Sequence, residues 1–277
     1  MKRRTVFLVF SSVALLGLGL WGFWLEPASL DVAEYRLTLP DYTGPSLRVA
    51  VLTDLHIGSP FNGLPKLRAT VARTNAARAD LVCILGDLVI QGVLGGRFVE
   101  PEAIAAELAN LRARDGVIAV LGNHEGWFDH NRVRRALERA GIRVLEDTAA
   151  QIVAPTASYW VAGISDLWTG RHDIPAALAP VPADARPLLL LTHNPDVFPE
   201  VPKRVTLTLA GHTHGGQVRL PLIGAPVVPS RYGQRFVAGH IVEGGRHLFV
   251  ATGVGTSILP VRFRVPPTIA VVTIGGS

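Results

Sequence analysis

Short hydrophobic runs, each ending in a few polar residues, recur along the chain from Leu47 onward. The runs are four or five residues long, rich in Val, Ile and Leu, a pattern typical of β-strands buried on both faces. They lie at 48–52, 81–85, 117–121, 188–191 and 206–210. Segments of helical composition or spacing fall between them, at 64–79, 102–113 and 131–140. Alternating strands and helices predict an α/β domain.

The first 25 residues follow a different pattern. Three basic residues at 2–4 precede the uncharged stretch 5–25, which as a helix would span about 31 Å, close to the hydrocarbon thickness of a bilayer. Trp21 and Trp24 near its far end suit the membrane interface. We predict an uncleaved membrane helix; a cleaved signal peptide is the alternative, although its apolar core is usually only about 7–15 residues long.

The basic residues at 2–4 also predict an orientation, because such charges stay in the cytoplasm and leave the following domain outside it. We therefore expect a protein of the bacterial inner membrane with a periplasmic catalytic domain. Arg3-Arg4 further resembles a loose twin-arginine export signal, with ordinary flanking charges as the alternative. Residues 26–46 are expected to form a proline-containing linker with one short extended piece at 35–39, and 47–277 a single domain.

Composition narrows the class of partner. Hydrophobic residues make up 48% of the 277 residues and charged residues 18%, which excludes a disordered chain. The net charge of +5 favours anionic partners such as phosphate-containing substrates or acidic lipids. Nucleic acid is not expected, because the chain has no long Lys or Arg run and is only 7% aromatic. The single cysteine, Cys83, excludes an intramolecular disulfide.

The polar residues after the predicted strands are the candidates for chemistry. They include five of the nine histidines and are Asp54, His56, Asp87, Asn123, His124, His193, His212 and His214. Ligands of open α/β sheets bind at the carboxyl ends of the strands. Imidazole nitrogens together with carboxylate oxygens suit Zn, Fe or Mn. The pattern therefore predicts a metal centre at one edge of the sheet.

The order and spacing of these residues resemble the five-block signature of the calcineurin-like metallophosphoesterases. The blocks are Asp54-Leu55-His56, Gly86-Asp87, Gly122-Asn123-His124-Glu125, His193 and Gly211-His212-Thr213-His214. The leading apolar segment and the tail at 211–217, 253–255 and 260–263 are similar to membrane-associated bacterial phosphodiesterases of this family. The resemblance implies a four-layer α-β-β-α sandwich, preceded here by one transmembrane helix.

The resemblance also implies two divalent metal ions, with Mn, Fe or Zn as the candidates. Asp87 would bridge both ions, and the remaining ligands would divide into two sets: Asp54, His56 and His214 for the first ion, and Asn123, His193 and His212 for the second. A bridging hydroxide would be the nucleophile, since a metal can lower the pKa of bound water from about 15.7 to about 7.

His124 would lie beside the metal ions, where the resemblance implies that it steadies the phosphate and protonates the leaving group. The alternative is that His124 only supports Asn123. The chain departs from the family pattern at Glu125, where the family often has Asp, and at Ile90, where it often has an acidic residue. Neither change removes a metal ligand.

These observations predict metal-dependent hydrolysis of a phosphodiester or pyrophosphate bond, on a lipid-linked or envelope substrate. The resemblance offers UDP-2,3-diacylglucosamine of lipid A synthesis as one candidate. That nucleotide lies in the cytoplasm, whereas the N-terminal charges point the domain outward, so a general envelope phosphodiesterase or phosphatase is the alternative. A non-catalytic metal-binding protein on the same fold is a further alternative, but it predicts lost ligands, and the motif is complete.

Overall fold

Two six-stranded β-sheets form the centre of the molecule. The computed structural model describes the chain except for residues 1, 41, 43, 155–157 and 277. In spatial order the first sheet contains β1 (Asp31–Thr38), β12 (Thr268–Gly275), β2 (Leu47–Leu52), β3 (Leu81–Leu85), β4 (Val117–Val120) and β5 (Arg143–Val144). The second contains β10 (Gly239–Glu243), β11 (Arg246–Val250), β9 (Leu207–Ala210), β8 (Leu188–Leu191), β7 (Ser158–Gly163) and β6 (Thr148–Val153).

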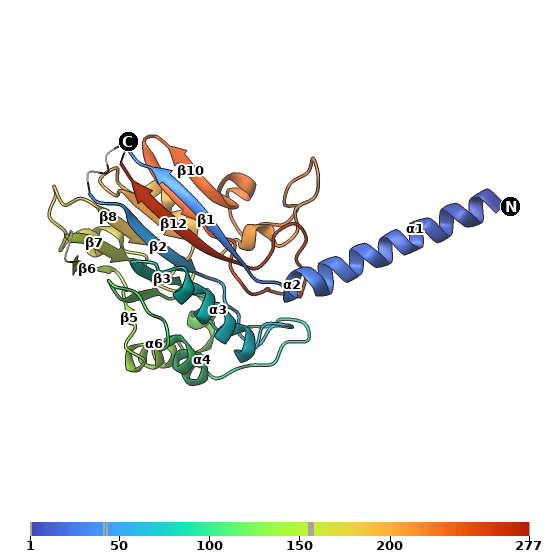
Figure 1. The fold of residues 1–277 in the computed structure, drawn as a ribbon. Coiled ribbons are helices and arrows are strands. Elements are labelled where there is room, and N and C mark those ends of the chain that lie inside the picture. Colours follow the sequence, from blue (N-terminus) through green and yellow to red (C-terminus); the bar gives the residue numbers. More distant parts are fainter. Residues whose placement is uncertain (1, 41, 43, 155–157, 277) are drawn as a thin grey trace.

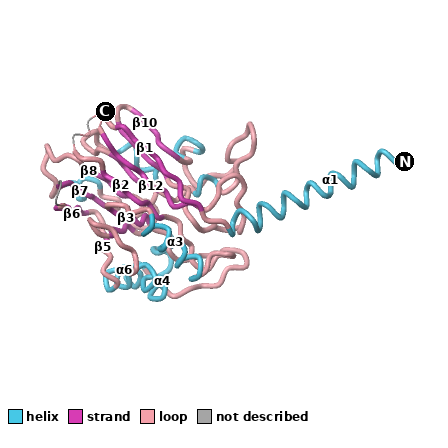
Figure 2. Tube along the Cα trace, viewed as in Figure 1, coloured by secondary structure: helices cyan, strands magenta, loops and turns pink. Residues whose placement is uncertain are grey.

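Helices cover the outer faces of both sheets (Figure 2). Over the first sheet lie α3 (Leu64–Ala76), α4 (Pro101–Leu108) and α6 (His130–Arg139). The second sheet is covered by α7 (Ile174–Leu178) and the short 3₁₀-helices η2 (Pro195–Glu200) and η4 (Gly233–Phe236). A third apolar core fills the space between the sheets. This arrangement confirms the predicted four-layer α-β-β-α sandwich.

The five predicted strands correspond to β2, β3, β4, β8 and β9, with ends that differ by at most one residue. Neighbouring strands run parallel from β2 to β5 and again from β7 through β8 and β9 to β11. Their carboxyl ends therefore meet at one edge of the sandwich. Helix α4 ends at Leu108, five residues before the predicted end at 113. Just after this end, the side chain of Asn110 donates to the carbonyls of Ala106 and Glu107, each at 3.2 Å.

The segment expected to be a linker contributes to the first sheet. Its strand β1 pairs in parallel with β12 over the whole of its length, from Asp31 against Thr268 to Thr38 against Gly275. Strand β12 is the last in the sequence, so the pairing joins the two ends of the domain. Only Leu37 of β1 is fully buried, which explains why an edge strand of this kind has a weak hydrophobic pattern.

The N-terminal segment is helical, as predicted. It runs through α1 (Lys2–Leu20), the π-helical turn η1 (Trp21–Leu25) and α2 (Glu26–Ala28). Val6–Ala28 has a mean hydropathy of 2.1, with 6% of its most apolar window buried against the protein. The helix therefore projects from the domain (Figure 1), and it is long and apolar enough to cross a membrane.

Candidate active site

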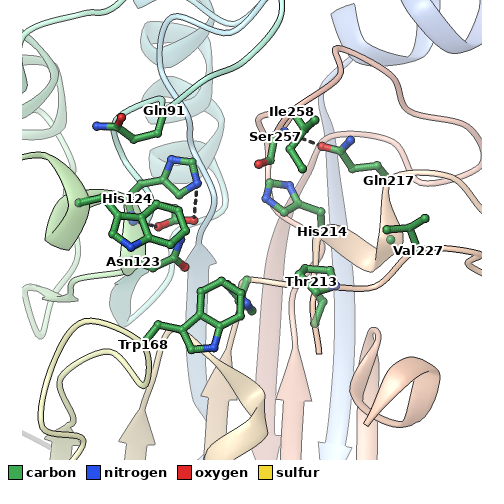
Figure 3. Close-up of a pocket in the computed structure, with 15 residues that line it drawn as sticks. Gln91, Asn123, His124, Trp168, Thr213, His214, Gln217, Val227, Ser257 and Ile258 are labelled. Atoms are coloured by element: carbon green, nitrogen blue, oxygen red, sulfur yellow. Dashed lines mark hydrogen bonds and ion pairs between the residues drawn. The ribbon is translucent and has the colours of Figure 1, made fainter. Parts of the chain in front are cut away.

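The candidate residues from both sheets meet at the edge where the parallel strands end. Asp54 and His56 follow β2, Asp87 follows β3, and Asn123 and His124 begin α5 (Asn123–Phe128) after β4. The second sheet supplies the remaining three, His193 after β8 and His212 and His214 after β9. All eight side chains are buried. They lie in and beneath a cavity of about 290 Å³ (Figure 3).

Several of these residues occupy the left-handed region of backbone conformation. Asp54, His56, Asp87, His212 and His214 have φ values of 50°, 39°, 54°, 68° and 52°. Such a conformation costs roughly 1–3 kcal/mol for a residue with a side chain and persists only where the surroundings enforce it. These turns direct five side chains from different strands toward one centre.

Two glycines make the close approach of these strand ends possible. A Cβ at Gly122 would lie 2.4 Å from Asp87 Oδ1, and one at Gly211 would lie 1.9 Å from Thr53 Oγ1. No side chain fits at either position without displacing the turn that carries Asp87 or Asp54.

The first group of converging ligand atoms comes from Asp54, His56, Asp87 and His214, and all four atoms lie within 4.8 Å of one another. The Nε2 atoms of His56 and His214 are 3.1 Å apart, and His214 Nε2 is 3.3 Å from Asp54 Oδ1. His56 Nε2 is 3.5 Å from Asp87 Oδ2. Two imidazole nitrogens and two carboxylate oxygens thus surround one point.

The second group shares Asp87 with the first. Asp87 Oδ2 is 3.2 Å from His193 Nε2, which is 3.1 Å from both His212 Nδ1 and Asn123 Oδ1. The ligand atoms of Asp87, His193 and His212 also lie within 4.8 Å of one another. One carboxylate oxygen therefore faces both groups. This is the arrangement needed to hold two cations close together.

The electrostatics of the site fit bound cations. Burial raises the pKa of Asp54 to about 7, and it lowers the pKa values of His56 and His212 to about 3. Neutral imidazole is the form that binds metals. Asp54 Oδ1 and His212 Nε2 are buried without a hydrogen-bond partner among the described residues. A divalent cation would compensate the buried carboxylates, and this set of nitrogen and oxygen donors suits Zn, Fe or Mn.

Backbone groups hold the ligands in place. The carbonyl of Leu85 lies 2.7 Å from His193 Nδ1, which leaves Nε2 directed at the centre. Asp54 Oδ2 accepts a hydrogen bond from the N–H of His212 at 3.0 Å, so a ligand of the first sheet is tied to one of the second. Contacts of this kind fix ligand orientation in metal sites.

Glu125 organises the backbone around Asp87. Its fully buried carboxylate accepts from the N–H groups of Asp87 and Gly122 at 2.8 Å each, and of Leu88 and Val89 at 2.7 and 3.3 Å. Burial and the nearby charge of Asp87 raise the pKa of Glu125, and the N–H groups oppose that shift. The described contacts of the carboxylate are thus with the strand-end turns rather than with the His124 ring.

His124 lies at the wall of the cavity. Its Nε2 atom is 3.8 Å from Asp87 Oδ2, and its backbone N–H donates to Asp87 Oδ1 at 3.0 Å (Figure 3). The Nδ1 atom is buried without a hydrogen-bond partner among the described residues. Burial lowers the pKa of His124. This position allows the imidazole to exchange a proton with a group bound in the cavity.

Two tryptophans that the sequence pattern did not predict lie at the mouth of the cavity. Trp127 and Trp168 are half-exposed, and their rings stack with centroids 6.1 Å apart. Trp168 stands edge-on to His212 at 4.4 Å. Asp166 holds this segment by accepting from the N–H groups of Trp168 and Thr169 at 2.9 and 3.0 Å. Trp168 does not follow a predicted strand, so no local signal linked it to the metal ligands. Trp127 lies three residues after His124 on α5, and that spacing could have identified it.

A second residue beyond the sequence prediction is Arg262. Its side chain is fully buried, and its guanidinium donates to the carbonyls of Thr252, Gly253, Gly255 and Val265. Burial lowers its pKa to about 10, so it remains charged at neutral pH. The loop that it binds packs on the ligands of the first group, because Gly255 N–H donates to the carbonyl of Asp54 at 2.7 Å.

Comparison with known proteins agrees with this geometry. The calcineurin-like phosphoesterase family model matches residues 47–216, and the chain belongs to that family. It is 31% identical to the phosphodiesterase YaeI of Escherichia coli over 89% of this chain and 88% of that protein. It is 28% identical to the metallophosphoesterase YkuE of Bacillus subtilis over 99% of this chain and 98% of that protein.

Solved structures confirm the fold. The NAD nucleotidase of Haemophilus influenzae superposes with a TM-score of 0.51 at 16% identity, over 77% of this chain and 46% of that chain. Family membership and the ligand groups together confirm the prediction of a metal-dependent phosphoric ester hydrolase.

Proposed function

We propose that the chain hydrolyses a phosphodiester or pyrophosphate bond of a membrane-associated substrate, with two divalent ions held by the seven predicted ligands. The observation that carries this proposal is the pair of ligand groups that share Asp87 Oδ2 beneath one cavity. Asp54, His56 and His214 would hold one ion. Asn123, His193 and His212 would hold the other.

Bound ions would supply hydroxide at neutral pH and neutralise charge that develops on the phosphoryl oxygens. The chain contributes positioning and proton transfer. Glu125 accepts hydrogen bonds from the N–H groups of Asp87 and Leu88 and so holds the turn that carries Asp87. His124 Nε2 would donate a proton to the leaving oxygen, a role that typically contributes about 10²–10⁴-fold to the rate.

The walls of the cavity indicate an amphiphilic substrate. Trp127, Trp168, Val227 and Ile258 line it above the polar floor. These apolar side chains would pack on an acyl chain or ring attached to the phosphate. The name of YaeI, a phosphodiesterase, supports a phosphodiester as the bond that is cleaved.

Two substrate classes follow from the two possible orientations of the domain. The basic residues at 2–4 favour a periplasmic domain, and hence a general phosphodiesterase or phosphatase of the envelope. UDP-2,3-diacylglucosamine would require a cytoplasmic domain. Reporters fused to the C-terminus distinguish these arrangements: a signal only from a cytoplasm-specific reporter would contradict the periplasmic orientation.

A substrate panel tests the proposed activity. Full-length protein reconstituted with Mn, Fe or Zn is assayed on a phosphomonoester, a phosphodiester, a lipid-linked pyrophosphate and UDP-2,3-diacylglucosamine. We expect metal-dependent hydrolysis that is greatest on the acylated diester or pyrophosphate. Asp87→Ala, which removes the shared ligand, is the matched control. Retention of full activity by this variant would refute the proposed site.

A further inference from the structure

Hydrogen bonds attach the end of the N-terminal helix to the rest of the domain. We call this end, residues 21–26, the helix foot. Glu26 is buried, and its carboxylate accepts from the backbone N–H of Val265 at 2.6 Å and from Trp21 Nε1 at 2.5 Å. The N–H of Arg262 donates to the carbonyl of Gly22 at 2.9 Å. Hydrogen bonds at Gly22 and Glu26 thus tie the end of the helix to the domain.

The loop that binds this foot also forms part of the cavity wall. Residues 257–264 contain Arg262, which contacts Gly22, and also Ser257 and Ile258, which line the cavity. Figure 3 shows Ser257 and Ile258 facing Gln91 and His124 across the cavity. The helix foot and the metal ligands are therefore separated by a single loop.

Two tryptophans indicate the level of the membrane surface. Trp21 and Trp24 are 49% and 56% exposed at the end of the apolar helix, where tryptophan is enriched at the boundary between lipid and water. The ring of Phe61, from the loop after β2, stacks on Trp24 with centroids 6.4 Å apart. A loop at the edge of the active site thus lies at the same depth as the interfacial tryptophans.

Three further loops also carry exposed apolar side chains. Leu222 is fully exposed, Ile258 is 71% exposed and Leu94 is 66% exposed. The loops are joined, because Leu94 N–H donates to the carbonyl of Ile258 at 2.9 Å and Val218 forms a β-bridge with Phe263. We call the whole set the apolar rim: Phe61, Leu94, Leu222, Ile223, Val227, Ile258 and Leu259.

The apolar rim lies on the side of the domain from which α1 extends. In Figure 1 the loop after β3 and the orange loop around 217–230 both reach toward that side. Exposed basic residues accompany the rim on the same loops, at Arg97, Arg219 and Arg264. Apolar side chains flanked by cations suit the boundary of an anionic bilayer.

We propose that the apolar rim rests in the headgroup region of the bilayer that holds α1, so that the cavity opens onto the lipid surface. The substrate's phosphate would then enter from the bilayer while its apolar part stays in lipid. The second statement rests on the proposed function, whereas the contact of the rim with lipid does not. The foot contacts support lipid rather than a protein as the occupant, because they place the loop of Ile258 beside a helix that is long and apolar enough to cross a membrane.

Fluorescence quenching tests the contact directly. Full-length protein in vesicles of phosphatidylethanolamine and phosphatidylglycerol is labelled with an environment-sensitive dye at Leu94→Cys or Leu222→Cys. The native Cys83 is buried in β3. Val153→Cys is the matched control, because Val153 is 77% exposed at the end of β6 that lies away from the cavity.

Doxyl-labelled lipid should remove most of the fluorescence at the two rim positions and none at the control. Equal, unquenched signals at all three positions would overturn the proposal. A rim signal that is shifted to the blue but unquenched would also overturn it, since a second copy or a protein partner would then cover the rim.

Activity separates this proposal from the proposed function. The double variant Leu94→Ser/Leu222→Ser should hydrolyse soluble methyl p-nitrophenyl phosphate like the parent, but hydrolyse a long-chain alkyl p-nitrophenyl phosphate in vesicles several-fold more slowly. Val153→Ser should change neither rate. Equal rates on the vesicle substrate for the double variant and the parent would contradict entry from the bilayer. A parent inactive on both substrates would instead refute a phosphodiester as the bond that is cleaved and leave the quenching result standing.

Discussion

The role of Glu125 leads to a prediction whose magnitude can be worked out from its contacts. The substitution Glu125→Gln keeps the shape of the side chain but replaces one acceptor oxygen with an amino group. Four N–H groups donate to the carboxylate, two to each oxygen. Two of them would lose their acceptor and face the amino group. Each hydrogen bond to a charged group contributes about 1.5–3 kcal/mol, so the free energy of unfolding should fall by about 3–6 kcal/mol.

The assay is thermal unfolding of the metal-loaded, full-length protein in detergent micelles. In a domain of this size, 1 kcal/mol corresponds to roughly 2–4 °C, so Glu125→Gln should unfold at least about 6 °C lower than the parent. The same turns carry Asp87, so metal affinity or activity should fall about 10- to 100-fold as well.

Glu102→Gln is the matched control. Glu102 is an exposed carboxylate that pairs with Arg132 at 2.8 Å on the surface, where such pairs contribute no more than about 1 kcal/mol. If Glu125→Gln shifted the midpoint no more than Glu102→Gln and kept full activity, the inferred role of Glu125 in holding Asp87 would be refuted.

Further predictions concern the metal centre and its surroundings. Asp87→Ala should lose bound metal, measured by elemental analysis, together with phosphodiester hydrolysis; unchanged metal content would contradict the shared-ligand role. His124→Ala should keep its metal while kcat falls about 10²–10⁴-fold, and a loss of metal would instead identify His124 as a ligand. A chelator should lower the unfolding temperature because buried carboxylates such as Asp54 lose their counter-charge, and added Mn or Zn should restore it. Arg262→Met should cost at least about 3 kcal/mol, because each buried carbonyl left without a donor costs about 1–3 kcal/mol, and an unfolding midpoint equal to that of Arg97→Met would argue against this.

The hydrophobic pattern was sufficient to locate the central strands and the residues that follow them. Strands such as β3 and β8 are buried on both faces, so each reads as an uninterrupted apolar run of the observed length. Only the end of the edge strand β1 was predicted, as a short extended piece at 35–39 within a linker. Its side chains are mostly exposed, and its pairing with β12 depends on residues more than 200 positions away.

The sequence by itself determined the chemical types available at the site and the strand end that carries each one. Only the tertiary structure decided which ligands share a cation position, because His193 reaches Asp87 across the packed sheets and Asp54 reaches His214 in the same way. The same holds for the apolar rim. Leu94, Leu222 and Ile258 are unremarkable loop residues in the sequence, and their three loops are joined only by contacts between distant segments. Local pattern encodes burial and secondary structure, whereas contacts between distant segments depend on the packing of the whole fold.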